Sequence, residues 1–79
     1  MVQARVSKAE LQELQYDGDG FPVNIGDQVM ALNQRATVRA IIPPLRAGST
    51  GRVVVQYFDN GAIREHYPSV IGASWKKVA

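Results

Sequence analysis

The sequence of 79 residues contains no cysteine and only one histidine, His66. The absence of cysteine excludes disulfide bonds, and His66 has no second histidine or cysteine with which to share a zinc ion. We therefore expect no metal site and no bound cofactor. A chain of this length has room for one domain with a small buried core. Association into a homo-oligomer would bury additional apolar surface.

Long apolar segments are also absent. No stretch approaches the roughly 20 continuous apolar residues that span a membrane. Residues 1–5 lack the apolar run of a signal peptide. The sequence therefore predicts a protein without a membrane span, and the cytoplasm is the expected compartment, with which the absence of cysteine agrees.

The net charge of +2 conceals an uneven distribution. Residues 1–33 contain two basic and five acidic side chains, whereas residues 34–79 contain seven basic and two acidic ones. A basic half can bind an acidic partner or a nucleic acid. Here the basic residues are dispersed rather than clustered, which favours an evenly solvated surface over a nucleic-acid interface.

The segment Ser7-Lys8-Ala9-Glu10 has the pattern of a helix capping box. The residues on either side, Val6 and Leu11, have the positions and the apolar character of a hydrophobic staple. We therefore predict a short α-helix over residues 8–15. Its narrow apolar stripe indicates a helix that packs against the rest of the domain.

The next segment, Asp17-Gly18-Asp19-Gly20, resembles the opening of a calcium-binding loop. The twelfth position of such a loop requires a bidentate glutamate, and this sequence has Gln28 there. The helices that flank such a loop are also missing. The segment is better interpreted as a turn-rich linker.

From residue 25 onward, short β-type runs alternate with turn signals at regular intervals. Residues 36–42 alternate in the way expected of a half-buried strand. Pro43-Pro44 ends that strand because proline cannot donate a hydrogen bond to a neighbouring strand. The run at residues 52–58 is the strongest β signal. The five predicted strands cover residues 28–32, 36–42, 52–58, 62–67 and 74–78, with a short proline-led turn at residues 68–71.

A hairpin turn is predicted at Asp59-Asn60-Gly61, since an Asn-Gly pair suits a type I′ turn. With a two-residue loop, Val54, Gln56 and Phe58 share a face with Ile63, Glu65 and Tyr67. A three-residue loop would shift this pairing by one residue. The sequence leaves both loops open.

This spacing of strands, with Gly26-Asp27 before the first strand and the proline-led turn before the last, resembles an SH3-like barrel. The resemblance covers about two thirds of the chain. It implies a mainly β fold, a small five-stranded SH3-like barrel over residues 26–79. The short N-terminal α-helix and the turn-rich linker of residues 1–25 would pack on this barrel.

Within that fold, residues 53–61 followed by Ile63 and Glu65 are similar to the Tudor pattern, in which a strand rich in valine and aromatics runs into an Asp-x-Gly turn. The resemblance implies an aromatic cage for methylated lysine or arginine. Its walls would be Tyr57, Phe58 and Tyr67, and Asp59 would supply a charge. The alternative is that these rings belong to the core.

A second resemblance is to plasmid-borne type II dihydrofolate reductase, a tetramer with a central pore. Gly26-Asp27-Gln28-Val29 matches the Gly-Asp-x-Val of that family, and Tyr67-Pro68 matches its Tyr-Pro. The active-site run of the family is Val-Gln-Ile-Tyr, whereas this chain has Arg64-Glu65-His66-Tyr67 and keeps only the tyrosine. The resemblance implies shared architecture more than shared activity.

The sequence contains few further candidates for catalytic or ligand-binding residues. Histidine is the residue type suited to acid–base chemistry near neutral pH, but the neighbour of His66, Glu65, lies on the opposite face of a strand and cannot pair with it. No serine or cysteine stands in a nucleophile motif, and residues 48–51 lack the lysine of a P-loop. Trp75, beside two lysines, is either a base-stacking residue or an anchor that seals the barrel, and we favour the anchor.

The sequence therefore predicts a non-enzymatic binding module that recognises a protein or peptide segment or a polyanion. The expected surface comprises the aromatic and basic residues near the hairpin, together with the loop of residues 43–51. The alternative is an oligomeric enzyme of the reductase type, with His66 and Tyr67 lining a pore. The predicted binding residues are Tyr57, Phe58, Asp59, Arg64, His66, Tyr67 and Trp75.

Overall fold

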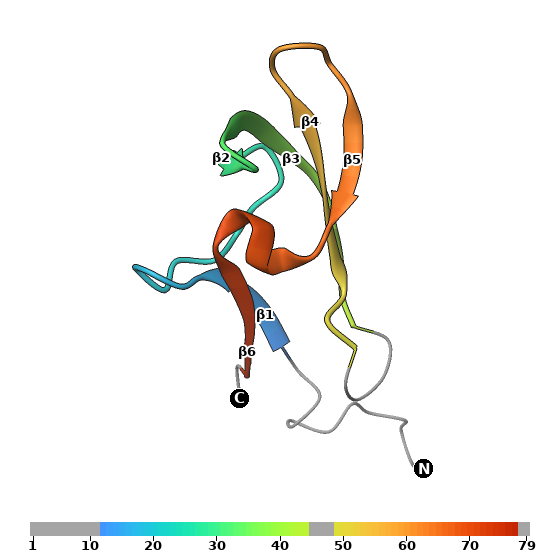
Figure 1. Ribbon diagram of the computed structural model, residues 1–79. Coiled ribbons are helices and arrows are strands. Elements are labelled where there is room, and N and C mark those ends of the chain that lie inside the picture. Colours follow the sequence, from blue (N-terminus) through green and yellow to red (C-terminus); the bar gives the residue numbers. More distant parts are fainter. Residues whose placement is uncertain (1–11, 45–48, 78–79) are drawn as a thin grey trace.

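The computed structural model describes residues 12–44 and 49–77, and the chain is mainly β (Figure 1). All five strands predicted between residues 28 and 78 are present, together with the proline-led turn. They are β2 (Gln28–Ala31), β3 (Gln34–Ile42), β4 (Arg52–Tyr57), β5 (Ile63–His66), the 3₁₀ turn η2 (Pro68–Ile71) and β6 (Ala73–Lys77). None of the described residues belongs to a helix long and apolar enough to cross a membrane.

The predicted N-terminal helix is wrong over the part that the structure describes. Residues 12–15 belong to a strand, β1 (Gln12–Tyr16), which pairs antiparallel with β6. Leu14 lies opposite Trp75 and is buried, while its neighbours in β1 are less buried. Pairing with β6 therefore decides the conformation of this segment in place of its local helical pattern. Residues 8–11 and the capping box lie outside the described residues.

The strands form two antiparallel sheets. One is a four-stranded sheet in the order β2-β3-β4-β5, and the other contains β1 and β6. Among the described residues, the hydrogen-bonded strands do not close into the five-stranded barrel that was expected. Strand β6 pairs with β1 and not with a strand of the large sheet. A β-bulge between Val38 and Ala40 interrupts the pairing of β3 with β4, and such bulges increase the local twist of a sheet.

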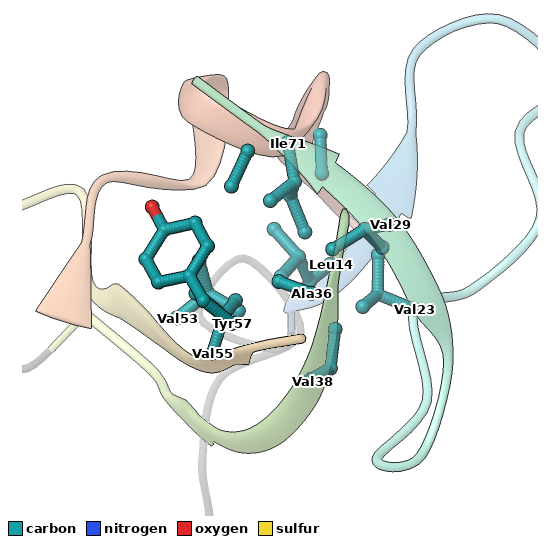
Figure 2. Packing of buried hydrophobic residues seen from close by; sticks show 11 residues of the cluster. Leu14, Val23, Val29, Ala36, Val38, Val53, Val55, Tyr57 and Ile71 are labelled. Atoms are coloured by element: carbon teal, nitrogen blue, oxygen red, sulfur yellow. The ribbon is translucent and has the colours of Figure 1, made fainter. Parts of the chain in front are cut away.

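The core lies between the two sheets. Strand β4 alternates strictly, with Val53, Val55 and Tyr57 buried and the residues between them half-buried, as expected when one face of a sheet is covered. Figure 2 shows side chains from both sheets and from η2 directed into one interior. The buried cluster consists of Leu14, Val23, Val29, Ala31, Ala36, Val38, Val53, Val55, Tyr57, Ile71 and Ala73.

Both hairpins of the large sheet differ from the sequence-based expectation. Strands β2 and β3 are joined by Leu32 and Asn33, both with positive φ (51° and 64°), as in a type I′ turn. Between β4 and β5 the loop has four residues, 58–61, and is closed by the bond from the Tyr57 N–H to the Ala62 carbonyl (2.8 Å). The four-residue loop leaves Gln56 opposite Ile63 and Val54 opposite Glu65, so these side chains share a face, as in the two-residue alternative and not the three-residue one.

The segment after β1 forms the predicted turn, and its carboxylates are engaged in hydrogen bonds. Asp17 accepts a bond from the Ser74 hydroxyl (2.5 Å), and Asp19 accepts one from the Phe21 N–H (2.9 Å). No group of three or more potential metal-ligating side chains occurs within the described part of the chain. These aspartates therefore act as turn and strand anchors.

The far end of the same segment is held by Asp27. Its Oδ2 accepts bonds from the Tyr16 hydroxyl (2.7 Å) and from the Asn24 N–H (2.9 Å). Burial, together with the hydrogen bond to Asp27 and its charge, raises the pKa of the Tyr16 hydroxyl above its ordinary value of about 10.

This raised pKa predicts a loss of stability at alkaline pH. Unfolded Tyr16 ionises near pH 10, whereas folded Tyr16 keeps its proton, so the folded state binds more protons and loses stability as the pH rises above about 10. We expect the free energy of unfolding in urea to fall more steeply above about pH 10 in the wild type than in Tyr16→Phe. Equal slopes would show that Tyr16 contributes nothing to the alkaline transition.

Candidate functional site

The predicted binding residues are divided among three places in the structure. Tyr57 and His66 meet at the edge of the core. Phe58, Asp59 and Arg64 lie on the exposed end of the β4–β5 hairpin. Tyr67 and Trp75 meet at a cavity, which makes them the pair with the clearest site geometry.

Tyr57 and His66 form a structural pair. The Tyr57 hydroxyl lies 2.7 Å from His66 Nε2, and the two rings are edge to face with their centroids 6.0 Å apart. The Tyr57 ring is buried (Figure 2). His66 lies opposite Val53 on the core side of β5, whereas Glu65 lies opposite Val54 on the other side, so the two do not face each other, as predicted.

The hairpin residues are exposed and dispersed. Phe58 lies under the guanidinium of Arg35, whose Cζ is 5.9 Å from the ring centroid. Arg64 donates a bond to the Ile63 carbonyl (2.9 Å), and Asp59 lies exposed in the loop. The structure thus places Tyr57 inside the core and Phe58 on the exposed hairpin, so the three rings of a Tudor-like cage do not form one wall.

The cavity has a volume of about 300 Å³ and lies between η2, β6 and the segment before β4. Its lining contains two aromatic rings, a proline, an alanine and several uncharged polar side chains. These residues are Gln12, Ser49, Thr50, Tyr67, Pro68, Ser69, Ala73, Ser74 and Trp75. We call this the Trp75 cavity.

Local backbone geometry places the two rings. Tyr67 is extended (φ −66°, ψ 147°) at the start of η2, which is the conformation that a following proline imposes. Gly72 ends η2 in the left-handed conformation (φ 72°), and β6 then carries Trp75 back beside Leu14. Trp75 Nε1 donates a bond to the Thr50 carbonyl (2.7 Å), which fixes the indole against the segment before β4.

Arg52 adds a charged group beside this cavity. Its Nη1 donates to the Gly51 carbonyl (2.7 Å) and to Thr50 Oγ1 (3.3 Å). Its Cζ lies 4.2 Å from the centroid of the Tyr67 ring, a cation–π distance. Thr50 and Tyr67 both line the cavity, so Arg52 contacts two of its lining residues.

Sequence reasoning found Tyr67 and Trp75 but missed most of the remaining lining. Pro68 and Ser69 were recognised only as a turn, whereas Ser49 and Thr50 belong to the loop of residues 43–51 that was expected to form part of the surface. The sequence contains no signal that brings these segments together, because Thr50 and Trp75 are 25 residues apart. The resemblance to the reductase is not tested by this arrangement and stays a prediction.

No protein-family model matches the chain, and no curated protein or solved structure matches it either.

Proposed function

We propose that this chain is a small non-enzymatic binding module with an SH3-like arrangement of strands, and that it recognises an extended protein segment at the Trp75 cavity. The order of the five strands from β2 to β6, with a proline-led 3₁₀ turn before the last, supports the SH3-like assignment. The cavity is the observation that carries the function.

The lining of the cavity suits an apolar side chain of a peptide. Its volume of about 300 Å³ lies at the lower end of the range for ligand sites. Tyr67 and Trp75 are the residue types that supply binding energy at interfaces, because their rings bury large areas while retaining a polar tip. Nearby hydroxyl groups, those of Ser49 and Ser69, can bond to the backbone of an extended segment.

A protein segment fits this lining better than a polyanion does. Binding of nucleic acid depends on lysine and arginine contacts to several phosphates, whereas the residues that line the cavity carry no charge and Arg52 beside them supplies a single cation. The aromatic rings of the hairpin are the weaker site, since Tyr57 is buried and Phe58 stands apart.

A peptide library displayed on phage tests this function. We expect selected peptides to shift the backbone amide signals of residues 67–75 in the ¹⁵N spectrum of the domain. Tyr67→Ala should weaken their binding by about tenfold or more, as truncation of an aromatic anchor does. Tyr67 is more than half exposed, so this variant should keep the wild-type fold.

Phe58→Ala is the matched control, because it removes a similarly exposed ring from the hairpin. Peptides that bind Tyr67→Ala as tightly as the wild type, or that shift the hairpin amides instead, would contradict the proposed site. Shifts caused by a single-stranded oligonucleotide would favour the polyanion. A solution mass of four chains would favour the pore enzyme.

A further inference from the structure

We infer that the segment bound at the Trp75 cavity carries a carboxylate next to the apolar group that enters the cavity, and that Arg52 binds this carboxylate. The inference rests on the proposed function, since it specifies the ligand of the same site. It depends on how Arg52 is held and on which of its donors are already used.

Three contacts hold the guanidinium of Arg52 in place without a ligand. Nη1 is bonded to the Gly51 carbonyl and to Thr50 Oγ1, and the Tyr67 ring lies against the guanidinium. Arg52 is also half-buried. An arginine held in this way loses little side-chain freedom when it binds, which favours affinity.

The contacts of Arg52 leave one edge of the guanidinium available. An arginine has five N–H donors, of which Nη1 supplies two and Nη2 and Nε supply the other three. Among the described residues, Arg52 donates side-chain hydrogen bonds through Nη1 alone, and neither acceptor is a carboxylate. Nη2 and Nε together form the fork that binds a carboxylate through two parallel bonds.

The position of Arg52 explains why the carboxylate should lie next to an apolar group. Thr50 and Tyr67 contact Arg52 and also line the cavity. A ligand that fills the cavity therefore passes the guanidinium within about one or two residues, given the roughly 3.3 Å rise of an extended chain. The carboxylate belongs either to an acidic side chain or to the chain terminus of the segment.

Three synthetic peptides distinguish these sources. The first is a capped hexapeptide, Gly-Ser-Phe-Asp-Ser-Gly, and the second has asparagine in place of aspartate. The third is the acetylated peptide Gly-Ser-Gly-Ser-Phe with a free terminal carboxylate. We expect the first or the third to shift the amides of residues 49–52 and 67–69, and the asparagine peptide to bind about fivefold or more weakly, as a lost charge-assisted pair predicts.

Arg52→Gln should abolish the preference for the carboxylate peptide that binds, the first or the third, over the asparagine peptide. Arg52→Lys should retain only part of it, because lysine keeps the charge and lacks the fork. Arg64→Gln is the control, since Arg64 is exposed on the hairpin and bonds to the Ile63 carbonyl; the preference should not change. The ratio of two affinities is measured within each variant, so a small loss of stability does not affect it.

The results separate this inference from the function on which it rests. Equal binding of all three peptides, a preference for a carboxylate retained in Arg52→Gln, or no binding of any of the three peptides would overturn the role of Arg52. Library peptides that bind at the cavity without a carboxylate would overturn it too, while supporting the proposed function. Library peptides that map away from the cavity would overturn both.

Discussion

Replacement of Gly51 by alanine is expected to destabilise the domain by about 3 kcal/mol, because two costs of known origin combine. Gly51 has φ +62°, and a residue with a side chain pays roughly 1–2 kcal/mol in that region. A Cβ atom at Gly51 would also overlap the backbone carbonyl oxygen of Ile42 and lie 3.1 Å from Trp75 Cζ2. Gly51 is buried, and backbone atoms cannot move aside as a flexible side chain can.

Gly20→Ala is the matched control for this variant. Gly20 has φ +77°, and a Cβ atom there would meet nothing within 4 Å. Its loss of stability should therefore contain the conformational cost alone, about 1–2 kcal/mol. Urea unfolding of the two variants measures the difference, which we attribute to the overlap with Ile42. If both variants lose the same stability, close packing around Gly51 contributes nothing.

The packing around Gly51 also links stability to the candidate site. Gly51 accepts the bond from Arg52 and lies beside Trp75, and it follows Thr50, which receives the indole bond. Any displacement of this backbone moves a wall of the Trp75 cavity. A Gly51→Ala protein that still folds should therefore bind the selected peptides more weakly.

The parts of the fold that the sequence predicted correctly are those with a local signal. Pro43-Pro44 marks the end of β3, which stops at Ile42, because proline cannot continue the ladder. The alternation of β4 and the proline of η2 are equally local. Leu32 and Asn33 were missed because leucine is rare at a position with positive φ, and here the pairing of β2 with β3 imposes that conformation.

The features of the structure that the sequence analysis did not predict depend on contacts between segments that are distant in the sequence. The capping pattern at residues 7–10 predicted a helix through residue 15, yet residues 12–16 pair with β6, about 60 residues later. The meeting of Tyr67 with Trp75 likewise needs the Thr50 carbonyl and the turn of η2. No periodicity within either segment encodes such contacts, so single residues of the site were found and their arrangement was not.

Leu14→Ala provides the sharpest test of the N-terminal strand. We expect this substitution to lower the free energy of unfolding by about 2–5 kcal/mol, the range for truncating a buried leucine. Leu14 is only 3 % exposed and lies opposite Trp75, and its carbonyl accepts a bond from the Val23 N–H (2.8 Å). Its side chain therefore belongs to the core that joins the two sheets. Removal of the Cγ and Cδ atoms of Leu14 leaves a cavity that the paired backbone cannot close.

Leu32→Ala is the control, since it makes the same chemical change at a leucine that is 64 % exposed in the β2–β3 turn. Its effect on urea unfolding should stay within about 0.5 kcal/mol, as for most surface substitutions. The ¹³Cα chemical shifts of residues 12–16 supply an independent readout, because strands and helices displace them in opposite directions. Helical shifts together with equal losses in the two variants would restore the helix that the capping pattern predicts, whereas strand shifts with a large loss only in Leu14→Ala would establish that β6 determines how this segment folds.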